Sequence, residues 1–112
     1  MNAIKNKVQL IGNLGNIPEI TETENGIKKA NLVVSTMETI RSHSGEKLRE
    51  TIWHNVTCYG KLAEICEKYL TKGTEIAVEG KLVNSHYTDK MGIKRYVTEV
   101  CANELLILTK QS

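Results

Sequence analysis

Residues 51–60 read TIWHNVTCYG, and this segment decides how the rest of the chain is interpreted. In a β-strand, alternate side chains point to opposite faces. One face of the segment then carries residues that suit a core, namely Ile52, His54, Val56 and Cys58. The opposite face carries two aromatic rings among polar side chains, namely Trp53, Asn55, Thr57 and Tyr59. The segment therefore predicts a strand with an inner apolar face and an outer aromatic face.

The two rings on the outer face suggest a binding surface. Six residues of strand separate Trp53 from Tyr59 by roughly 20 Å, which is enough for several nucleotides of an extended strand. Unpaired bases stack on exposed aromatic rings and gain about 1–3 kcal/mol per base. The alternative is that one of the rings lies under a loop, because Trp and Tyr are often partly buried.

A chain of 112 residues forms one domain, or two very small ones, and we expect a single domain over residues 1–112. The hydrophobic fraction of 40% supports a core, and the net charge of +2 is only weak support for a polyanionic partner. No apolar run reaches the roughly 18 residues of a membrane span, so we expect no membrane partner. The N-terminus shows no signal-peptide pattern, and we expect a cytoplasmic protein.

Three cysteines, an odd number without a C-x-x-C pair, fit a reducing compartment. They could be metal ligands, but Cys58 and Cys66 fall on apolar faces, so we expect small buried hydrophobic residues and no metal or cofactor. The histidines show no ligand spacing either. No nucleophile–base pair, paired carboxylates or phosphate-binding glycine motif emerges, so no catalytic residues are assigned and we expect a binding protein, not an enzyme.

Upstream of the central segment, the pattern predicts two more strands, over residues 5–14 and 28–39. Gly12, Gly15 and Pro18 mark the end of the first strand and a loop, and Asn25-Gly26 is a strong turn signal. The polar segment 41–49 is interpreted as a mobile hairpin loop.

Downstream, the period of the apolar residues changes. A helix of about ten residues is indicated by helical spacing in Leu62, Ile65, Cys66, Tyr69 and Leu70. Lys72-Gly73 would stop it. A fourth strand follows over residues 76–82, then a loop or extended hairpin tip over 84–94. The fifth strand, over 95–108, has no alternation that fixes its inner face.

The order β-β-β-α-β-β predicts an all-β fold, a five-stranded Greek-key OB-fold barrel with one short helix between strands three and four. In that fold, the second and third strands and the loops between strands one and two and between four and five form the ligand face. Trp53 and Tyr59 lie on the third strand, and Tyr87 falls in the loop between the fourth and fifth.

The chain resembles the N-terminal domain of bacterial single-stranded DNA-binding proteins. The resemblance rests on pieces that follow in order through most of the chain: residues 7–15, 53–56, 59–64, 69–73, 78–82 and 95–100. It implies that single-stranded DNA is the partner and that binding is independent of sequence. It also implies a role in DNA replication, recombination or repair.

The resemblance also implies residue roles. Trp53 matches a base-stacking tryptophan, Tyr59 stands where relatives usually have phenylalanine, and Tyr87 where they often have tryptophan. Some relatives have a further stacking tryptophan where this chain has Ile40, which cannot stack. Lys61 and Lys72 match residues that approach backbone phosphates. We add Asn55, on the Trp53 face, and Arg95, one of the basic residues that the barrel would place on or beside that face.

Members of this family are commonly homotetramers whose dimers pair through their first strands. The resemblance therefore implies a homotetramer, with His54 at a subunit contact and Val8 and Leu10 on the pairing strand. Relatives usually continue into a disordered linker and an acidic tip that recruits other proteins. This chain stops at Ser112 without such a tip, so it is either cut or a short paralogue, and tail-dependent replication and repair partners are not expected. A tail-less OB-fold adaptor, like primosomal replication protein N, is the alternative function.

Overall fold

Alternating apolar and polar side chains form the strands of a barrel, and one amphipathic segment forms a helix. The computed structural model describes residues 4–108. Its elements are β1 (Val8–Leu14), β2 (Glu19–Glu22), β3 (Lys28–Arg41), β4 (Lys47–Tyr59), α1 (Lys61–Tyr69), β5 (Glu75–Thr88) and β6 (Lys94–Ile107). The expectation about the end of the chain concerns residues 109–112, which lie outside the described range.

The barrel closes because β1 pairs with two strands. It runs antiparallel to β5, from Val8 opposite Gly80 to Asn13 opposite Glu75. Its end also pairs with β3, where Asn13 lies opposite Ser35. The pairs β3–β4, β4–β6 and β5–β6 complete the ring, and β4–β6 is parallel. The expected five-stranded Greek-key OB-fold barrel with one helix, here between β4 and β5, is confirmed.

Gly12 allows β1 to cross β3 at close range. A Cβ atom at this position would overlap the backbone carbonyl oxygen of Ser35 and press on Val34. Only a residue without a side chain fits between the two backbones. The glycine that marks the end of the first strand in the sequence is therefore needed to close the barrel.

One strand was not expected. β2 lies in the segment interpreted as a loop, and it pairs with the start of β3, with Glu19 opposite Asn31 and Glu22 opposite Lys28. Only Ile20 of its residues is partly buried against the core. Four residues with one inward side chain give too short a pattern to distinguish a strand from a loop.

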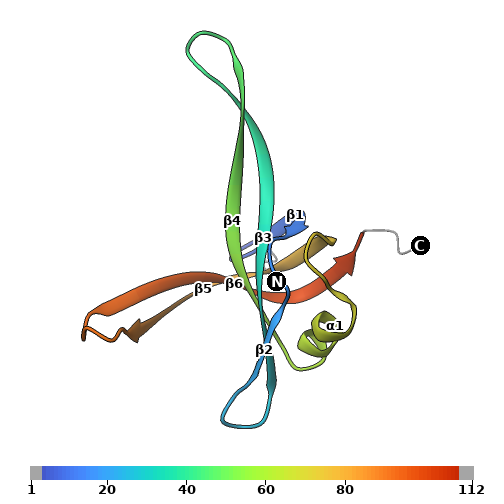
Figure 1. The fold of residues 1–112 in the computed structure, drawn as a ribbon, viewed down its shortest axis with the longest axis vertical. Helices are drawn as coiled ribbons and strands as arrows, with labels where there is room; N and C mark the ends of the chain where they lie inside the picture. The colour runs from blue at the N-terminus through green and yellow to red at the C-terminus, as the bar shows by residue number, and fades with distance from the viewer. Residues whose placement is uncertain (1–3, 109–112) are drawn as a thin grey trace.

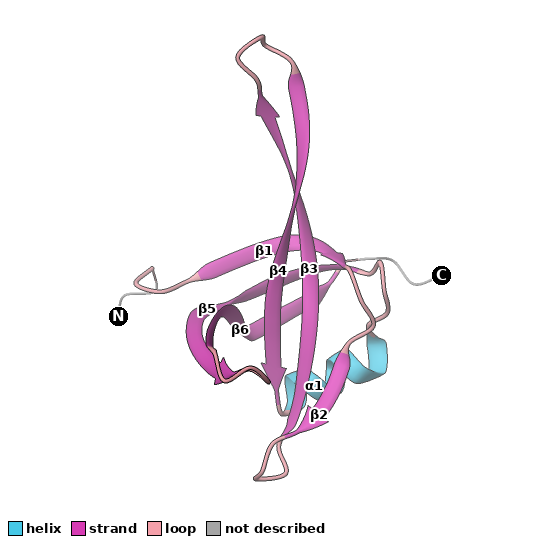
Figure 2. Ribbon diagram, turned by 60° about the vertical axis from the view of Figure 1, so that its left-hand side comes forward, coloured by secondary structure: helices cyan, strands magenta, loops and turns pink. Residues whose placement is uncertain are grey.

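The β3–β4 hairpin extends further than expected. The sequence predicts a loop over residues 41–49, but β3 reaches Arg41 and β4 starts at Lys47, which leaves only a short turn. The segment 84–94 takes the second of its two expected forms, an extended hairpin tip, so Tyr87 lies on β5, opposite Arg95 of β6, and not in a loop as expected. Figure 1 shows the two hairpins as arms that leave the barrel in different directions, and Figure 2 shows the strong twist of the β3–β4 arm.

The core fills the inside of the barrel, and α1 covers one end of it. Its buried apolar residues are Leu14, Ala30, Leu32, Val34, Val56, Cys58, Ala63, Cys66, Leu70, Ile76, Val78 and Val100. Ile65 and Tyr69, which were expected on the buried stripe of the helix, are instead exposed, and Ala63 faces the core in their place. The reason is that the barrel end admits only a narrow strip of a short helix.

The burial expected for Cys58 and Cys66 is confirmed. Cys58 and Cys66 are buried, Cys101 is half-buried, and all three are free thiols. A hydrogen bond with Cys66 and burial both raise the pKa of Cys58 above its usual range. Because the thiolate is the reactive form, Cys58 should be chemically inert.

Candidate nucleic-acid interface

The outer face of β4 is the first part of the candidate site. The ring of Trp53 is 61% exposed and that of Tyr59 is 43% exposed, and Asn55 between them is also exposed. Both rings are open to solvent, so the alternative that one of them is buried under a loop is wrong. Thr57 departs from the expected pattern at 4% exposure, because β3 and β6 flank β4 on both sides at this point.

The loop after β1 supports the ring of Trp53. A Cβ atom on Gly15 would overlap the edge of the indole ring, so the ring lies directly against the backbone of this glycine. The Gly15 N–H donates a hydrogen bond of 2.7 Å to the Val33 carbonyl oxygen on β3. This bond fixes the loop beside the strand pair that carries Trp53, and the ring is held in place while one face stays open.

A lysine accompanies Tyr59. Lys29 lies opposite Tyr59 in the β3–β4 pair, and its Nζ atom is 5.8 Å from the centre of the ring. This distance is within the range of a cation–π contact. An aromatic face and a positive charge therefore lie side by side at this end of β4. A nucleotide could stack its base on Tyr59 and place its phosphate near Lys29.

The β5–β6 arm supplies the third expected ring. Tyr87 is 55% exposed and lies opposite Arg95. Val83 and Ser85 line a cavity beside Tyr59, and strand alternation puts Tyr87 on the same face of the arm as these two residues. Arg95 is engaged within the arm, since its Nε atom donates a 2.9 Å hydrogen bond to Asp89 Oδ2.

The two expected phosphate contacts, Lys61 and Lys72, lie before and after the core of α1 in the chain. Lys61 starts α1, two residues after Tyr59, and is exposed. Lys72 is exposed in the turn before β5. The next residue, Gly73, donates a 2.8 Å hydrogen bond to the Leu14 carbonyl, so Lys72 lies near Gly15 and the Trp53 side of the face.

A groove runs along the outer face between the rings and the β5–β6 arm. It contains two cavities of about 300 and 190 Å³. The first is lined by Asn16, Glu19, Asn31, Leu32, Val33, Asn55, Val56, Val97 and Glu99, and the second by Lys29, Thr57, Tyr59, Val83, Ser85, Glu99 and Cys101. Amides, hydroxyls and one shared carboxylate thus lie between apolar side chains, as in a site that holds flat, polar-edged ligands.

The β3–β4 arm extends this face with cations that were not among the expected contacts. Residues directly opposite each other share a face, and the outer face of the arm continues from Trp53 through the pairs 35/53, 37/51, 39/49 and 41/47. It carries Arg41, Lys47 and Arg49 and no acidic residue, whereas Glu38 and Glu50 lie on the reverse face. The register of the β3–β4 hairpin separates the cations from the acidic residues. The sequence pattern did not predict this register, because it did not locate the turn between the two strands.

The residues expected at subunit contacts, His54, Val8 and Leu10, do not lie on the outer face of β4. His54 is half-buried on the inner side of β4, and its Nε2 atom is 2.9 Å from Thr36 Oγ1. Val8 and Leu10 point toward the barrel and pack against the core. Across Val8–Gly12, the pairings of the described residues give β1 a neighbour only on the β5 side, so its other backbone edge is open.

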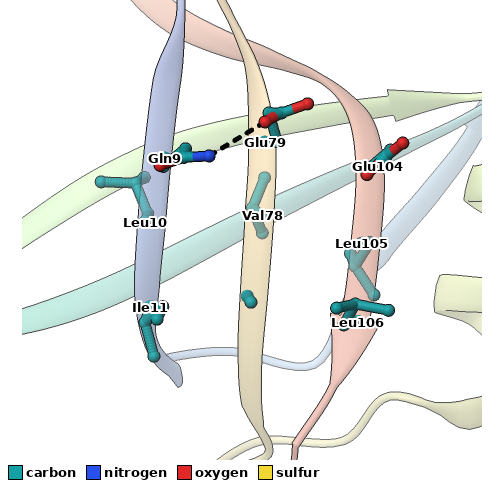
Figure 3. Close-up of a pocket in the computed structure, with 9 residues that line it drawn as sticks. Gln9, Leu10, Ile11, Val78, Glu79, Glu104, Leu105 and Leu106 are labelled. Carbon is teal, nitrogen blue, oxygen red and sulfur yellow. Dashed lines mark hydrogen bonds between the residues drawn. The ribbon is translucent and has the colours of Figure 1, made fainter.

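A second exposed surface covers β1, β5 and β6. Figure 3 shows its residues, with Ile11 and Leu106 pointing outward around a cavity of about 230 Å³. Both side chains are 64% exposed. On the same surface, Gln9 Nε2 donates a 3.0 Å hydrogen bond to Glu79 Oε1, and Lys7 Nζ lies 3.0 Å from the same oxygen. Together these contacts lower the pKa of Glu79. This surface is apolar in its centre and polar on one rim, as is typical of protein interfaces.

Within residues 4–108, the structure groups no three His, Cys, Asp or Glu side chains as metal ligands. No helix in that range is long and apolar enough to cross a membrane. What the described chain offers instead is an open barrel face with exposed rings and a groove. That combination defines an OB-fold protein that presents a ligand surface on one side of its barrel.

The chain belongs to the single-strand binding protein family, whose model matches residues 5–108. It is 41% identical over 104 residues to single-stranded DNA-binding protein 1 of Chlorobaculum tepidum, covering 92% of this chain and 64% of that protein. It is 44% identical over 107 residues to single-stranded DNA-binding protein 1 of Xylella fastidiosa, covering 95% and 79% of the two chains. The family is named for binding, which agrees with the expectation of a binding protein.

Solved structures share the fold. The structure described as Plasmodium falciparum SSB in complex with ssDNA matches with a TM-score of 0.84 at 29% identity, covering 97% of this chain and all of that one. A deletion mutant of the single-stranded DNA binding protein from Thermus aquaticus matches with a TM-score of 0.82 at 30% identity, covering 93% of this chain and 50% of that one. Some of these relatives are therefore considerably longer than the matched region.

Proposed function

We propose that this protein binds single-stranded DNA, without requiring a defined sequence, along the outer face of β4 and the groove beside it. The observation that carries this proposal is the common exposure of Trp53, Tyr59 and Tyr87 along one face that also carries cations. Every base has a face that can stack on such rings, so stacking gives affinity with little dependence on sequence. The names of the relatives support the same partner.

Cations around the groove would follow the phosphate backbone. Lys29 and Lys61 lie at the Tyr59 end, and Lys72 lies near Trp53. Arg95 lies beside Tyr87, and the outer face of the β3–β4 arm would continue the path. Each phosphate that these residues neutralise releases condensed counterions, so affinity should fall as salt rises. We expect Asn55, which is exposed on β4 between the two rings, to hydrogen-bond a base.

In the cell, this activity would cover DNA strands that are exposed during replication, recombination or repair. The work would take place in the cytoplasm, where bacterial DNA lies. We expect partners that bind an acidic tail in longer relatives not to be recruited by residues 4–108.

A homotetramer is the form in which we expect the protein to act. The open edge of β1 over Val8–Gly12 offers backbone groups that a second copy could pair with. The apolar surface around Ile11 and Leu106 offers a second contact, and two different self-contacts are what a tetramer built from two dimers needs. His54 is half-buried where the inner face of β4 continues into the reverse face of the β3–β4 arm, and we expect a neighbouring subunit to contact it there.

The deciding experiment uses the intrinsic fluorescence of Trp53, the only tryptophan of the chain. Adding oligo(dT) should quench it, and a duplex of equal length should not. Raising the salt concentration should weaken the binding. Unchanged fluorescence and unchanged mobility at saturating oligo(dT) would refute the proposal and favour an adaptor that acts through protein contacts.

A further inference from the structure

Glu99 occupies an unusual place in the groove. It lies on β6 opposite Val83 and is the one residue that lines both cavities along the outer face of β4. It is half-buried. Glu19 also lines the groove, but it is exposed and borders only the first cavity. A single carboxylate therefore sits at the junction of the two cavities.

This carboxylate has no partner within the protein. No hydrogen bond or ion pair joins Glu99 to any other residue of the described range. Lys29 lines the same cavity, but its ammonium group lies over the ring of Tyr59 instead of pairing with Glu99. Solvent reaches the carboxylate, since the described residues include no buried side-chain oxygen that lacks a hydrogen-bond partner. A strand that fills the groove would displace this solvent, and a desolvated carboxylate without a donor is costly. It would also oppose the approach of a polyanion, so the bound ligand has to supply a donor at this point.

Bases that enter a groove beside stacked rings carry such donors on their edges. Cytosine, adenine and guanine have an exocyclic amino group, and a carboxylate accepts well from an amino group of this kind. Uracil and thymine instead offer one ring N–H between two carbonyl oxygens, which repel a carboxylate. The amides of Asn31 and Asn55 can both donate and accept, so they tolerate either kind of base.

We propose that Glu99 is a base-reading residue, which favours amino-bearing bases over uracil and thymine at the junction of the two cavities. The inference rests on the proposed binding of single-stranded DNA. It adds a modest preference at one point of a path that otherwise accepts any sequence. The expected strength is that of one charged hydrogen bond to a base edge, not that of a sequence-specific site.

Oligo(dC) and oligo(dU) of equal length test this directly, because the two bases differ only on the edge that Glu99 would read. Quenching of Trp53 fluorescence at fixed salt gives both affinities. For Glu99→Gln, loss of the negative charge should strengthen binding to both strands. The preference for dC relative to dU should nevertheless fall about five-fold or more, the lower end of what one good base-edge contact provides. Glu24→Gln, at an exposed position in the turn between β2 and β3 that lines neither cavity, is the matched control and should leave the ratio unchanged.

Glu99→Asp separates position from charge. It keeps the carboxylate but draws it back by one methylene, so the dC to dU ratio should fall while binding to dU stays near that of the unaltered chain. An unchanged ratio in both variants would overturn the base-reading role even if both strands still bind, and the proposed function would survive. If the unaltered chain binds neither strand, the proposed function fails, and the inference fails with it.

Discussion

The indole ring of Trp53 lies directly over the backbone of Gly15, with no room for a side chain at residue 15. The loop after β1 thereby sets the height and tilt of the ring on β4. The contact leaves 61% of the tryptophan exposed while it supports one side of it. A preorganised ring loses less conformational freedom when a base stacks on it.

Gly15→Ala should therefore weaken DNA binding although it removes no contact to DNA. The added methyl group would push the ring aside, and the loss should approach the roughly 1–3 kcal/mol generally found for base stacking in single-strand binding proteins. Oligo(dT) titration gives the affinity, and the emission spectrum of Trp53 reports the ring displacement. The control is Trp53→Ala, in which a further Gly15→Ala change should have no additional effect. Independent, additive losses would show that Gly15 acts in another way.

The tyrosines should differ according to the face they occupy, not according to their exposure. Tyr59→Ala and Tyr87→Ala should each weaken binding to oligo(dT) by about 1–3 kcal/mol. Tyr96 is more exposed than either of them, at 75%, but it lies on the reverse face of the β5–β6 arm, opposite His86. The centres of these two rings are 6.1 Å apart.

Tyr96→Ala is therefore the matched control, and it should bind DNA as the unaltered chain does. Fluorescence titration at one salt concentration compares all three variants. A loss for Tyr96→Ala equal to that for Tyr59→Ala would mean that the DNA path does not follow the outer face of β4.

These faces could be predicted from sequence only in part. Alternation around Trp53 and Tyr59 correctly indicated the outer face of β4, because a strand with one buried face keeps a period of two. Thr57 could not be placed, since its burial depends on β6, which is distant in the sequence. The inner face of β6 was also not predictable, because the register shifts where Glu79 and Gly80 of β5 lie opposite Glu104 and Ala102 of β6. Such a shift interrupts the alternation.

The extent of the β3–β4 arm was not predicted, for a different reason. A two-stranded ribbon that solvent reaches on both faces needs no apolar alternation, so residues 41–49 looked like a loop. The positions of Arg41, Lys47 and Arg49 on one face follow only from the cross-strand register. Glu99 could not be recognised either, because its isolation in the groove depends on packing that no short pattern encodes.

The arm offers a test of its own. Replacing Arg41, Lys47 and Arg49 by Ala together should weaken binding to long oligo(dT) and make it less dependent on salt. For single strands, the slope of log K against log salt should fall by about 0.7 for each phosphate that the variant no longer neutralises. Glu38→Gln with Glu50→Gln changes charge on the reverse face of the same arm and should leave that slope nearly unchanged. An equal change of slope in both sets would indicate a long-range field and not direct neutralisation of phosphates.

The turn of the β5–β6 arm should loosen in acid. Asp89 Oδ1 accepts 2.9 Å hydrogen bonds from the Ile93 and Met91 N–H groups, and Arg95 donates to Oδ2. The Ile93 bond first, and then Arg95, lower the pKa of Asp89 below its ordinary value of 3.8. A lowered pKa in the folded arm means that the stabilisation is present above the unfolded value and is lost as pH falls through the folded one.

Amide hydrogen exchange at Ile93 and Met91 should therefore accelerate as pH drops below about 4, beyond the intrinsic pH dependence of exchange. Asp89→Asn should exchange faster at neutral pH and show no such acid transition. It should also release Arg95 from its ion pair. If the protection of Ile93 is the same in both proteins at pH 7, the carboxylate does not hold the turn.

The tetramer can be tested by size and by one surface change. Four chains of 12.6 kDa give about 50 kDa, which light scattering resolves from the dimer and the monomer. Ile11→Lys places a charge in the centre of the apolar surface shown in Figure 3, beside Leu106, and leaves the backbone edge of β1 free to pair. Burial of an unpaired charge is costly, so this variant should stop at a dimer of about half the mass.

Lys5→Ala, outside that surface, should remain tetrameric. A monomeric unaltered chain at micromolar concentration would contradict the tetramer, and a dimeric one would favour the adaptor function.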